Sequence, residues 1–259
     1  GEPLISIVIP NKDHVEDLRR CITSIEKKST WKNYEIVVVE NNSVEQSIRD
    51  YYKELESDPK VKIVTYEGGF NYSRINNVGV KETKGEYLLF LNNDTEVISP
   101  DWMEQLLMYA QRKDVGAVGA KLYYADNTIQ HAGVVIGLGA HRSAGHTHYK
   151  MPREHLGYMG RLCYAQDVTA VTGACLMVKK SIYEEVDGLD ESFTISLNDV
   201  DLCLKIREKG YLNIFTPFAE LYHYESKSRG MEEGEKLRRY ERECAHFRDK
   251  WKEQLDAGD

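Results

Sequence analysis

Residues 85–94 read GEYLLFLNND, a short apolar strand that ends in two amides and a carboxylate. The strand is apolar on both faces, which is typical of the interior of a parallel sheet that is covered on both sides. Three similar strands are predicted upstream at 5–9 (ISIVI), 34–40 (YEIVVVE) and 61–66 (VKIVTY), and helical patterns separate them. This alternation predicts an α/β fold with a Rossmann-like, mostly parallel central sheet and helices on both of its faces.

Polar side chains follow three of the four predicted strands. PNKDH comes after the first strand, ENNS after the second and NNDTE after the fourth. Ligands of such sheets bind beyond the carboxyl ends of the strands, so we expect the three clusters to form one site. Asp13 and Glu16 have the spacing of a capping box and predict the start of the first helix.

The composition excludes several classes of protein. The chain has 259 residues and a net charge of −8, which argues against a protein that coats nucleic acid. No apolar run approaches the roughly 20 residues that a membrane-spanning helix needs. The five cysteines form no CxxC pair and are expected to be reduced, which indicates the cytoplasm, with at most peripheral contact to the inner face of the cell membrane. Because the first residue is not Met, we expect a piece of a longer protein, although a trimmed tag explains this start equally well.

The second half of the chain has a different pattern. Residues 120–170 are rich in Gly, His and Tyr, and predict loops and irregular strands that form a flap or an acceptor surface. A helix is predicted at 197–211, and apolar residues three or four apart over 231–255 predict an amphipathic C-terminal helix that packs back on the domain. We therefore divide the chain into a nucleotide-binding half (1–119), an acceptor and catalytic half (120–230) and a C-terminal helical extension (231–259).

Three acidic side chains and one histidine are considered as metal ligands, as a general base or as structural residues. Asp94 is either part of a strand-ending turn or an oxygen ligand for Mg²⁺ or Mn²⁺ beside a diphosphate. Asp199 lies at the entrance of the helix predicted at 197–211, where a carboxylate can face a cleft and remove a proton from an attacking hydroxyl. Asp201 fits N-terminal capping of that helix. A lone His such as His223 is more often structural, but beside an Asp and a polyphosphate its imidazole suits Mn²⁺.

A basic run, ESKSRG (225–230), follows His223 closely. It is either a solvated loop or a flexible loop that closes over a diphosphate, in which case Lys227 and Arg229 offset the phosphate charge. The motifs GxxxxGK[ST], GxSxG and HExxH do not occur in the chain. A P-loop, a nucleophile elbow and a zinc-protease helix are therefore excluded.

The chain resembles a family-2 glycosyltransferase of the GT-A fold in segments that cover most of its length. The segments that carry the resemblance are FNYSRINNVGVKETKGEYLLFLNNDTEVISPDWMEQL (70–106), VTGACLMVKKSIYEEVDGLDESF (171–193), LNDVDLCLKIREKGY (197–211) and LYHYESKSRG (221–230). They look most like the rhamnosyltransferase-like branch that builds bacterial surface polysaccharide. The resemblance implies a GT-A catalytic domain over residues 1–230.

The resemblance also implies roles for individual residues. Asp94 and His223 would coordinate Mn²⁺ or Mg²⁺, and Asp199 would be the general base. The residues implied in nucleotide-sugar binding are Pro10, Asn11, Glu40, Arg74, Asn93, Asp94, Gly173, Ala174, Lys227 and Arg229. The chain departs from the acidic motifs of the family at Asn92, which replaces the first Asp of DxD, and at Asn198, which replaces the Glu of an ED pair.

The implied function is inverting transfer of a sugar from a UDP- or dTDP-linked donor to a hydroxyl of a saccharide or lipid-linked saccharide, in bacterial cell-surface polysaccharide synthesis. No nucleic-acid partner is expected. A nucleotidyltransferase is the alternative enzyme class, although only Lys12 follows the first strand where a Gly-rich activating loop would be needed. A non-catalytic module that binds nucleotide sugar or carbohydrate is the other alternative, because Asn92 and Asn198 replace acidic residues.

Overall fold

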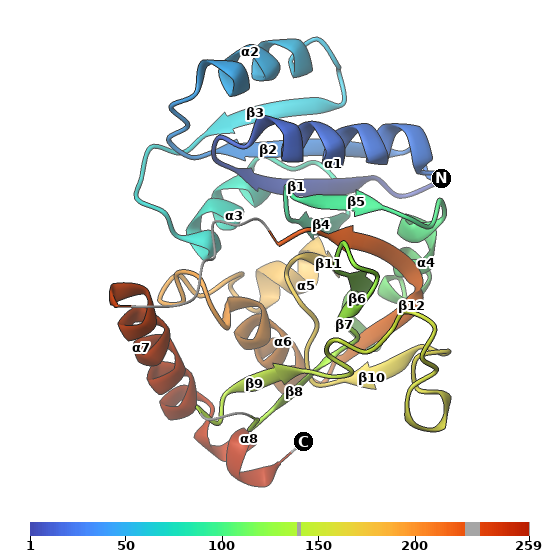
Figure 1. Ribbon diagram of the computed structural model, residues 1–259, viewed down its shortest axis with the longest axis vertical. Helices are drawn as coiled ribbons and strands as arrows, with labels where there is room; N and C mark the ends of the chain where they lie inside the picture. The colour runs from blue at the N-terminus through green and yellow to red at the C-terminus, as the bar shows by residue number, and fades with distance from the viewer. Residues whose placement is uncertain (139–140, 226–233, 259) are drawn as a thin grey trace.

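The computed structural model describes residues 1–138, 141–225 and 234–258, and its centre is a ten-stranded sheet with helices on both faces (Figure 1). The strands of this sheet are β1 (Ile5–Asn11), β2 (Tyr34–Glu40), β3 (Val61–Thr65), β4 (Tyr87–Leu91), β5 (Thr95–Val97), β6 (Val115–Tyr123), β7 (Ile129–His131), β10 (Gln166–Val168), β11 (Cys175–Lys179) and β12 (Leu212–His223). A separate hairpin consists of β8 (Val134–Ile136) and β9 (Ala144–His146). The helices are α1 (Val15–Lys28), α2 (Gln46–Leu55), α3 (Tyr72–Lys81), α4 (Trp102–Ala110), α5 (Lys180–Glu185), α6 (Asn198–Glu208), α7 (Glu235–Lys250), α8 (Lys252–Ala257) and the 3-10 helix η1 (Tyr158–Gly160).

The sheet has a parallel half and a mixed half. Its strands lie in the order β10-β12-β6-β11-β4-β1-β2-β3, with β5 paired to β12 and β7 paired to β6. The strands β3, β2, β1 and β4 run parallel, as the alternation of strands and helices predicts. The second half is mixed, because β11 runs antiparallel between β4 and β6, whereas β6 and β12 are parallel to each other. The α/β class is confirmed.

Two hydrophobic clusters cover the two faces of the sheet. Successive residues of one strand belong to different clusters, because side chains alternate along a strand. In β1, Ile7 belongs to the cluster with α1, α2 and α4, whereas Val8 belongs to the cluster with α3, α5 and α6. Leu89 and Phe90 of β4 divide in the same way. Burial on both faces explains why these strands are continuous apolar runs.

The capping box predicted for α1 does not form. This helix begins after His14, whose φ of 52° is left-handed and whose side chain makes no capping hydrogen bond. The Asp13 carboxylate instead accepts hydrogen bonds from the backbone N–H groups of Val44 (2.7 Å) and Glu45 (2.9 Å), just before α2. The prediction was wrong because Asp13 binds a loop more than 30 residues away in the chain, which the spacing within one helix does not reveal.

The C-terminal segment packs back on the domain, as its periodicity predicts. Cys244 and Phe247 of α7 and Trp251 after it are buried. Figure 1 shows α7 and α8 on the same side of the molecule as α6 and the β8–β9 hairpin. Within the described ranges, no helix has the length and the apolar character that crossing a membrane requires.

Candidate active site

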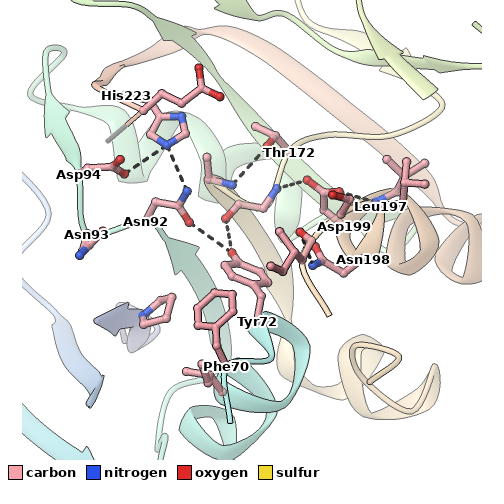
Figure 2. A pocket seen from close by; sticks show the side chains of 18 of the residues that line it. Phe70, Tyr72, Asn92, Asn93, Asp94, Thr172, Leu197, Asn198, Asp199 and His223 are labelled. Atoms are coloured by element: carbon pink, nitrogen blue, oxygen red, sulfur yellow. Dashed lines mark hydrogen bonds and ion pairs between the residues drawn. The ribbon is translucent and has the colours of Figure 1, made fainter. Parts of the chain in front are cut away.

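A cleft of about 680 Å³ opens where β1 and β4 end. The residues with a predicted role in binding, metal coordination or catalysis that line this cleft are Pro10, Asn11, Asn93, Asp94, Gly173, Ala174, Asp199 and His223. Asp94 and His223 lie on one side of it and Asp199 on the other (Figure 2). The fold therefore brings together polar residues from both halves of the chain.

Asp94 and His223 form a close pair at the ends of two strands. Asp94 follows β4, and His223 is the last residue of β12. The Nε2 atom of His223 lies 3.2 Å from Oδ1 of Asp94, and both side chains are about nine-tenths buried, with 12% and 8% of their surface exposed. Its Nδ1 atom lies 2.5 Å from Oε1 of Gln130, which can only accept a hydrogen bond. Gln130 therefore keeps a proton on Nδ1 and leaves Nε2 facing Asp94.

This pair has the chemistry of a cation site. Nε2 of the imidazole and a carboxylate oxygen of Asp94 converge at 3.2 Å, an arrangement that a positive charge between or beside them stabilises. The amide of Asn92 also approaches Nε2, at 3.1 Å. An imidazole with one carboxylate fits Mn²⁺ or Mg²⁺, whose remaining ligands are commonly water and phosphate oxygens. Among the described residues, no group of three or more His, Cys, Asp or Glu is placed to hold a metal, so an ion here would rely on such outside ligands.

Asp199 lies in the first turn of α6 and faces the cleft. The helix starts after Leu197, whose φ of 64° is left-handed. The Oδ2 atom of Asp199 accepts a hydrogen bond from the backbone N–H of Gly173 (2.8 Å), and its Oδ1 atom accepts one from the N–H of Val200 (2.8 Å). The two hydrogen bonds fix the orientation of the carboxylate, and each oxygen keeps a lone pair for a third partner.

Both backbone polar groups of Gly173, the N–H and the carbonyl oxygen, form hydrogen bonds. Its N–H donates to Asp199, and its carbonyl oxygen accepts a hydrogen bond from the hydroxyl of Tyr72 (3.0 Å). A Cβ atom at this position would lie 3.1 Å from the Tyr72 hydroxyl oxygen and 3.4 Å from Cβ of Asp199. The close approach explains why glycine occupies the position. Tyr72 was missed in the sequence because its partner is 101 residues away.

A chain of hydrogen bonds runs behind the side of the cleft that Asn11 and Asn93 line. The amide of Asn93 donates to Oδ1 of Asn11 (2.6 Å), and the amide of Asn11 donates to the hydroxyl of Tyr52 (2.7 Å). Tyr52 in turn donates to Glu40 (2.8 Å), which also accepts from the backbone N–H of Ser43 (2.6 Å). Burial raises the pKa of Tyr52, so its proton stays on the phenol. Glu40 is thus placed behind Asn11 and does not line the cleft.

Of the other predicted residues, one lies away from the cleft and two fall outside the described part of the chain. Arg74 lies on α3, half-exposed, and its Nε atom pairs with Glu191 at 2.6 Å. It is absent from the cleft lining. Lys227 and Arg229 fall in 226–233 and lie outside the described residues.

A buried histidine supports the segment that leads to Gly173. Burial lowers the pKa of His131 well below its ordinary value, so the ring is neutral. Its Nε2 atom accepts hydrogen bonds from the backbone N–H groups of Gly133 and Thr172, both at 3.4 Å. The ring proton must then be on Nδ1, which lies 2.9 Å from Nδ1 of His146, a residue of the cleft wall.

Helix α7 forms part of the cleft wall. Three of its side chains line the cleft: Lys236, Arg239 and Tyr240. One turn later, the buried carboxylate of Glu243 accepts hydrogen bonds from the backbone N–H groups of Thr194 (2.9 Å) and Ser196 (2.9 Å). This carboxylate anchors the loop that leads into α6, and hence the backbone that carries Asp199.

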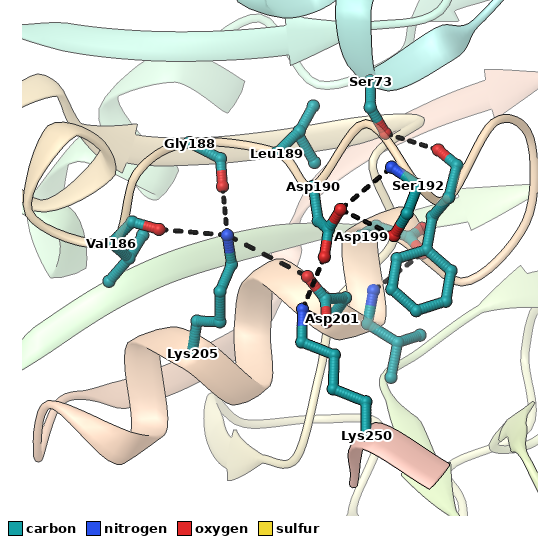
Figure 3. A network of polar contacts seen from close by, with 12 residues as sticks. Ser73, Val186, Gly188, Leu189, Asp190, Ser192, Asp199, Asp201, Lys205 and Lys250 are labelled. Atoms are coloured by element: carbon teal, nitrogen blue, oxygen red, sulfur yellow. Dashed lines mark hydrogen bonds and ion pairs between the residues drawn. The ribbon is translucent and has the colours of Figure 1, made fainter. Parts of the chain in front are cut away.

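A second anchor joins α6 to the end of α7, and it corrects the interpretation of Asp201 (Figure 3). The carboxylate of Asp201 is fully buried and does not cap its helix. Its Oδ1 atom accepts a hydrogen bond from Nε1 of Trp251 (2.8 Å) and pairs with Nζ of Lys250 (2.7 Å). Lys205 lies 3.9 Å from the other oxygen. Burial acts to lower the pKa of Lys250, but its hydrogen bonds to Asp190 and Asp201 outweigh that effect and raise it.

The two anchors cross residue 230, the predicted boundary between the acceptor and catalytic half and the C-terminal helical extension. Glu243 and Trp251 lie on one side of that boundary, and their partners in 194–201 lie on the other. The cleft likewise takes Asp199 from one side and Arg239 from the other. The C-terminal helices therefore belong to the structure that forms the cleft.

Comparison with known proteins places the chain among longer relatives. It is 48% identical over 255 residues to "Uncharacterized protein y4gI" of Sinorhizobium fredii, a match that covers 97% of this chain and 28% of the relative. It is 37% identical over 232 residues to the O-antigen biosynthesis protein RfbC of Myxococcus xanthus, covering 88% of this chain and 18% of the relative. The chain thus spans less than a third of the length of either relative.

The fold and the family agree with the site. The structure of GalNAc-T7 with UDP, GalNAc and Mn²⁺ is similar with a TM-score of 0.74 and 19% identity, over 96% of this chain and 49% of that one. This likeness confirms the GT-A fold. The family model "Glycosyl transferase family 2" matches residues 6–187, which is more than half of the chain. The chain therefore belongs to glycosyl transferase family 2.

Proposed function

We propose that this chain is the catalytic domain of a metal-dependent, inverting glycosyltransferase. It would move a sugar from a nucleoside-diphosphate sugar to a hydroxyl of a saccharide or lipid-linked saccharide, in synthesis of bacterial cell-surface polysaccharide. The observation that carries the proposal is the cleft with the Asp94–His223 pair on one side and Asp199 on the other. The similarity to an O-antigen biosynthesis protein supports the polysaccharide context.

The donor side of the cleft would hold the sugar nucleotide. Asp94 and His223 would hold Mn²⁺ or Mg²⁺, which when bound offsets the charge of the leaving diphosphate. Five residues that line the cleft are proposed as donor contacts: Pro10, Asn11, Asn93, Gly173 and Ala174. Glu40 would contribute to binding of a uracil or thymine base by holding Tyr52 and Asn11 in place. We keep Lys227 and Arg229 as proposed contacts of the diphosphate and Arg74 as a contact near the nucleotide.

The acceptor side would carry out the proton transfer. Asp199 takes the proton of the acceptor hydroxyl while that oxygen forms a bond to the anomeric carbon of the donor. The bond between the anomeric carbon and the diphosphate oxygen breaks in the same displacement, so the anomeric configuration inverts. The Gly173 N–H and the Val200 N–H hold the carboxylate in position for this step.

The proposal is tested by incubating the protein with a panel of UDP-, dTDP- and GDP-sugars, with Mn²⁺, with Mg²⁺, and with EDTA. We expect release of nucleoside diphosphate from at least one donor in the presence of a metal, and none in EDTA. If no donor is bound or turned over, the chain is not a transferase. Formation of a sugar nucleotide and pyrophosphate from a sugar phosphate and a nucleoside triphosphate would instead establish the nucleotidyltransferase alternative.

A variant of Gln130 tests the metal site without removing a ligand. Gln130→Leu removes the acceptor that fixes the Nδ1–H form of His223. Loss of such a supporting hydrogen bond commonly weakens metal binding by about 10- to 100-fold. We therefore expect the Mn²⁺ concentration for half-maximal activity to rise by about that factor, while kcat at saturating Mn²⁺ changes little.

The control for this variant is Gln46→Leu, because Gln46 is an exposed glutamine of α2 that pairs with Asp50 away from the cleft. It should leave the metal dependence unchanged. An unchanged metal dependence in Gln130→Leu would show that His223 does not bind the ion.

A further inference from the structure

One face of α7 points positive charge into the cleft. Lys236, Arg239 and Tyr240 line the cleft, and Lys236 precedes the other two by three and four residues, which places it on the same side of the helix as both of them. Glu243 continues this face one turn later. The chain as a whole carries a net charge of −8, so the two cations on this face stand out against an acidic protein.

This face of α7 is connected to Asp199 through the loop that leads into α6. Glu243 binds the backbone of Thr194 and Ser196, which leads directly into the first turn of α6. The ring of Tyr240, on the same helix, packs edge-on against His141, with 5.2 Å between ring centres. Arg239 therefore lies on the Asp199 wall of the cleft. A molecule whose hydroxyl reaches Asp199 would extend along this wall, whereas the donor diphosphate belongs with Asp94 and His223.

One nitrogen of the Arg239 guanidinium, Nε, has no hydrogen-bond partner among the described residues. This atom is also shielded from solvent. A shielded N–H without an acceptor is unfavourable, so a bound acceptor group would be stabilised there. The planar guanidinium matches the two oxygens of a carboxylate or phosphate. Lys236, three residues earlier, adds a second positive charge on the same face.

We propose that Arg239, together with Lys236, forms an anion-binding subsite for the acceptor, so that the acceptor carries a phosphate or a carboxylate next to the sugar that is extended. This inference rests on the proposed function. Two kinds of acceptor supply such a group: a sugar linked to a lipid through a diphosphate, and a saccharide that contains a uronic acid.

The test measures binding of three probes to protein saturated with Mn²⁺ and the nucleoside diphosphate selected by the donor panel. The probes are N-acetylglucosamine on farnesyl diphosphate, octyl glucuronide and the uncharged octyl glucoside. We expect one of the anionic probes to bind more tightly than the glucoside. In Arg239→Gln its affinity should fall by about 10- to 100-fold, as for the loss of a charged hydrogen-bonded contact. The glucoside should bind equally to both proteins.

Arg238→Gln is the matched control, because Arg238 is the preceding residue of α7, is exposed and does not line the cleft. Arg239→Lys should recover part of the affinity, which separates a charge effect from damage to the helix. The proposal is overturned if neither anionic probe binds better than the glucoside, or if Arg239→Gln weakens binding of the nucleoside diphosphate instead. Failure of the proposed function would appear separately, as a donor panel in which nothing is turned over.

Discussion

Asp199→Asn is expected to lower kcat for sugar transfer by about 10²- to 10⁴-fold, the usual contribution of a general base. The amide has nearly the shape of the carboxylate but cannot take the proton of the acceptor hydroxyl. Donor binding should change by no more than about twofold, because the proposed donor contacts Asn11, Asn93 and Asp94 are unaltered. The measurements are kcat from release of nucleoside diphosphate, and the donor dissociation constant by calorimetry.

The design of this variant must allow for the hydrogen bonds of Asp199. Its two oxygens accept from the N–H groups of Gly173 and Val200, and an amide can satisfy only one of them. A melting temperature close to that of the unaltered protein is needed to exclude a displaced α6. Asp126→Asn, at an exposed turn outside the cleft, serves as the control for the chemical change. Transfer at an ordinary rate by Asp199→Asn would mean that another group is the base.

Lys250→Met is expected to lower the free energy of unfolding by about 3 kcal/mol, because it removes the close cation of a fully buried carboxylate. Asp201 would keep its hydrogen bond from Trp251, but its next cation, Lys205, lies 3.9 Å away. The loss should appear as a lower midpoint in urea unfolding. Transfer activity should fall as well, since the same anchor holds α6 and therefore Asp199.

Two further variants complete this test. Lys252→Met removes the lysine of an exposed pair with Asp256 on α8, and such pairs contribute about 0–1 kcal/mol. It controls for replacing a lysine near the C-terminus by methionine. The double change Lys250→Met with Asp201→Asn removes both charges and keeps an acceptor for Trp251, so it should be more stable than Lys250→Met alone. If Lys250→Met costs no more than Lys252→Met, the buried pair does not hold the helices together.

The strands, and the meeting of Asn11, Asn93 and Asp94 in one cleft, were predictable because their signals are local. β1, β2 and β4 are apolar on both faces, and the polar residues that follow them in sequence lie at one edge of the sheet by the geometry of parallel strands. Asn11, Asn93 and Asp94 could therefore be assigned to one site. Asp199 and His223 required the family resemblance, because nothing in their own neighbourhoods distinguishes them from structural residues.

The errors and omissions have a common physical cause. Asp13 and Asp201 both sit where a helix cap is expected, yet each binds a partner that is 31 or more residues away in the chain. The periodicity of α7 predicts a buried face, but not that Arg239 would meet a cleft. Tyr72 and Gln130 act through hydrogen bonds to residues far away in the chain, and no pattern in the sequence marks them.

The anchors of α7 also set an order of events during protein synthesis. The ribosome completes β1, β4 and β12, and with them the proposed donor side of the cleft, before it makes the residues of α7 that anchor α6 and the loop leading into it. Glu243 follows Thr194 by 49 residues, and Trp251 follows Asp201 by 50. A nascent chain that has emerged only as far as β12 would therefore carry the proposed donor residues while α6, which carries the proposed base, is not yet anchored. We expect such a chain to capture sugar nucleotide before it is able to use it, so that transfer begins only once α7 has emerged and docked.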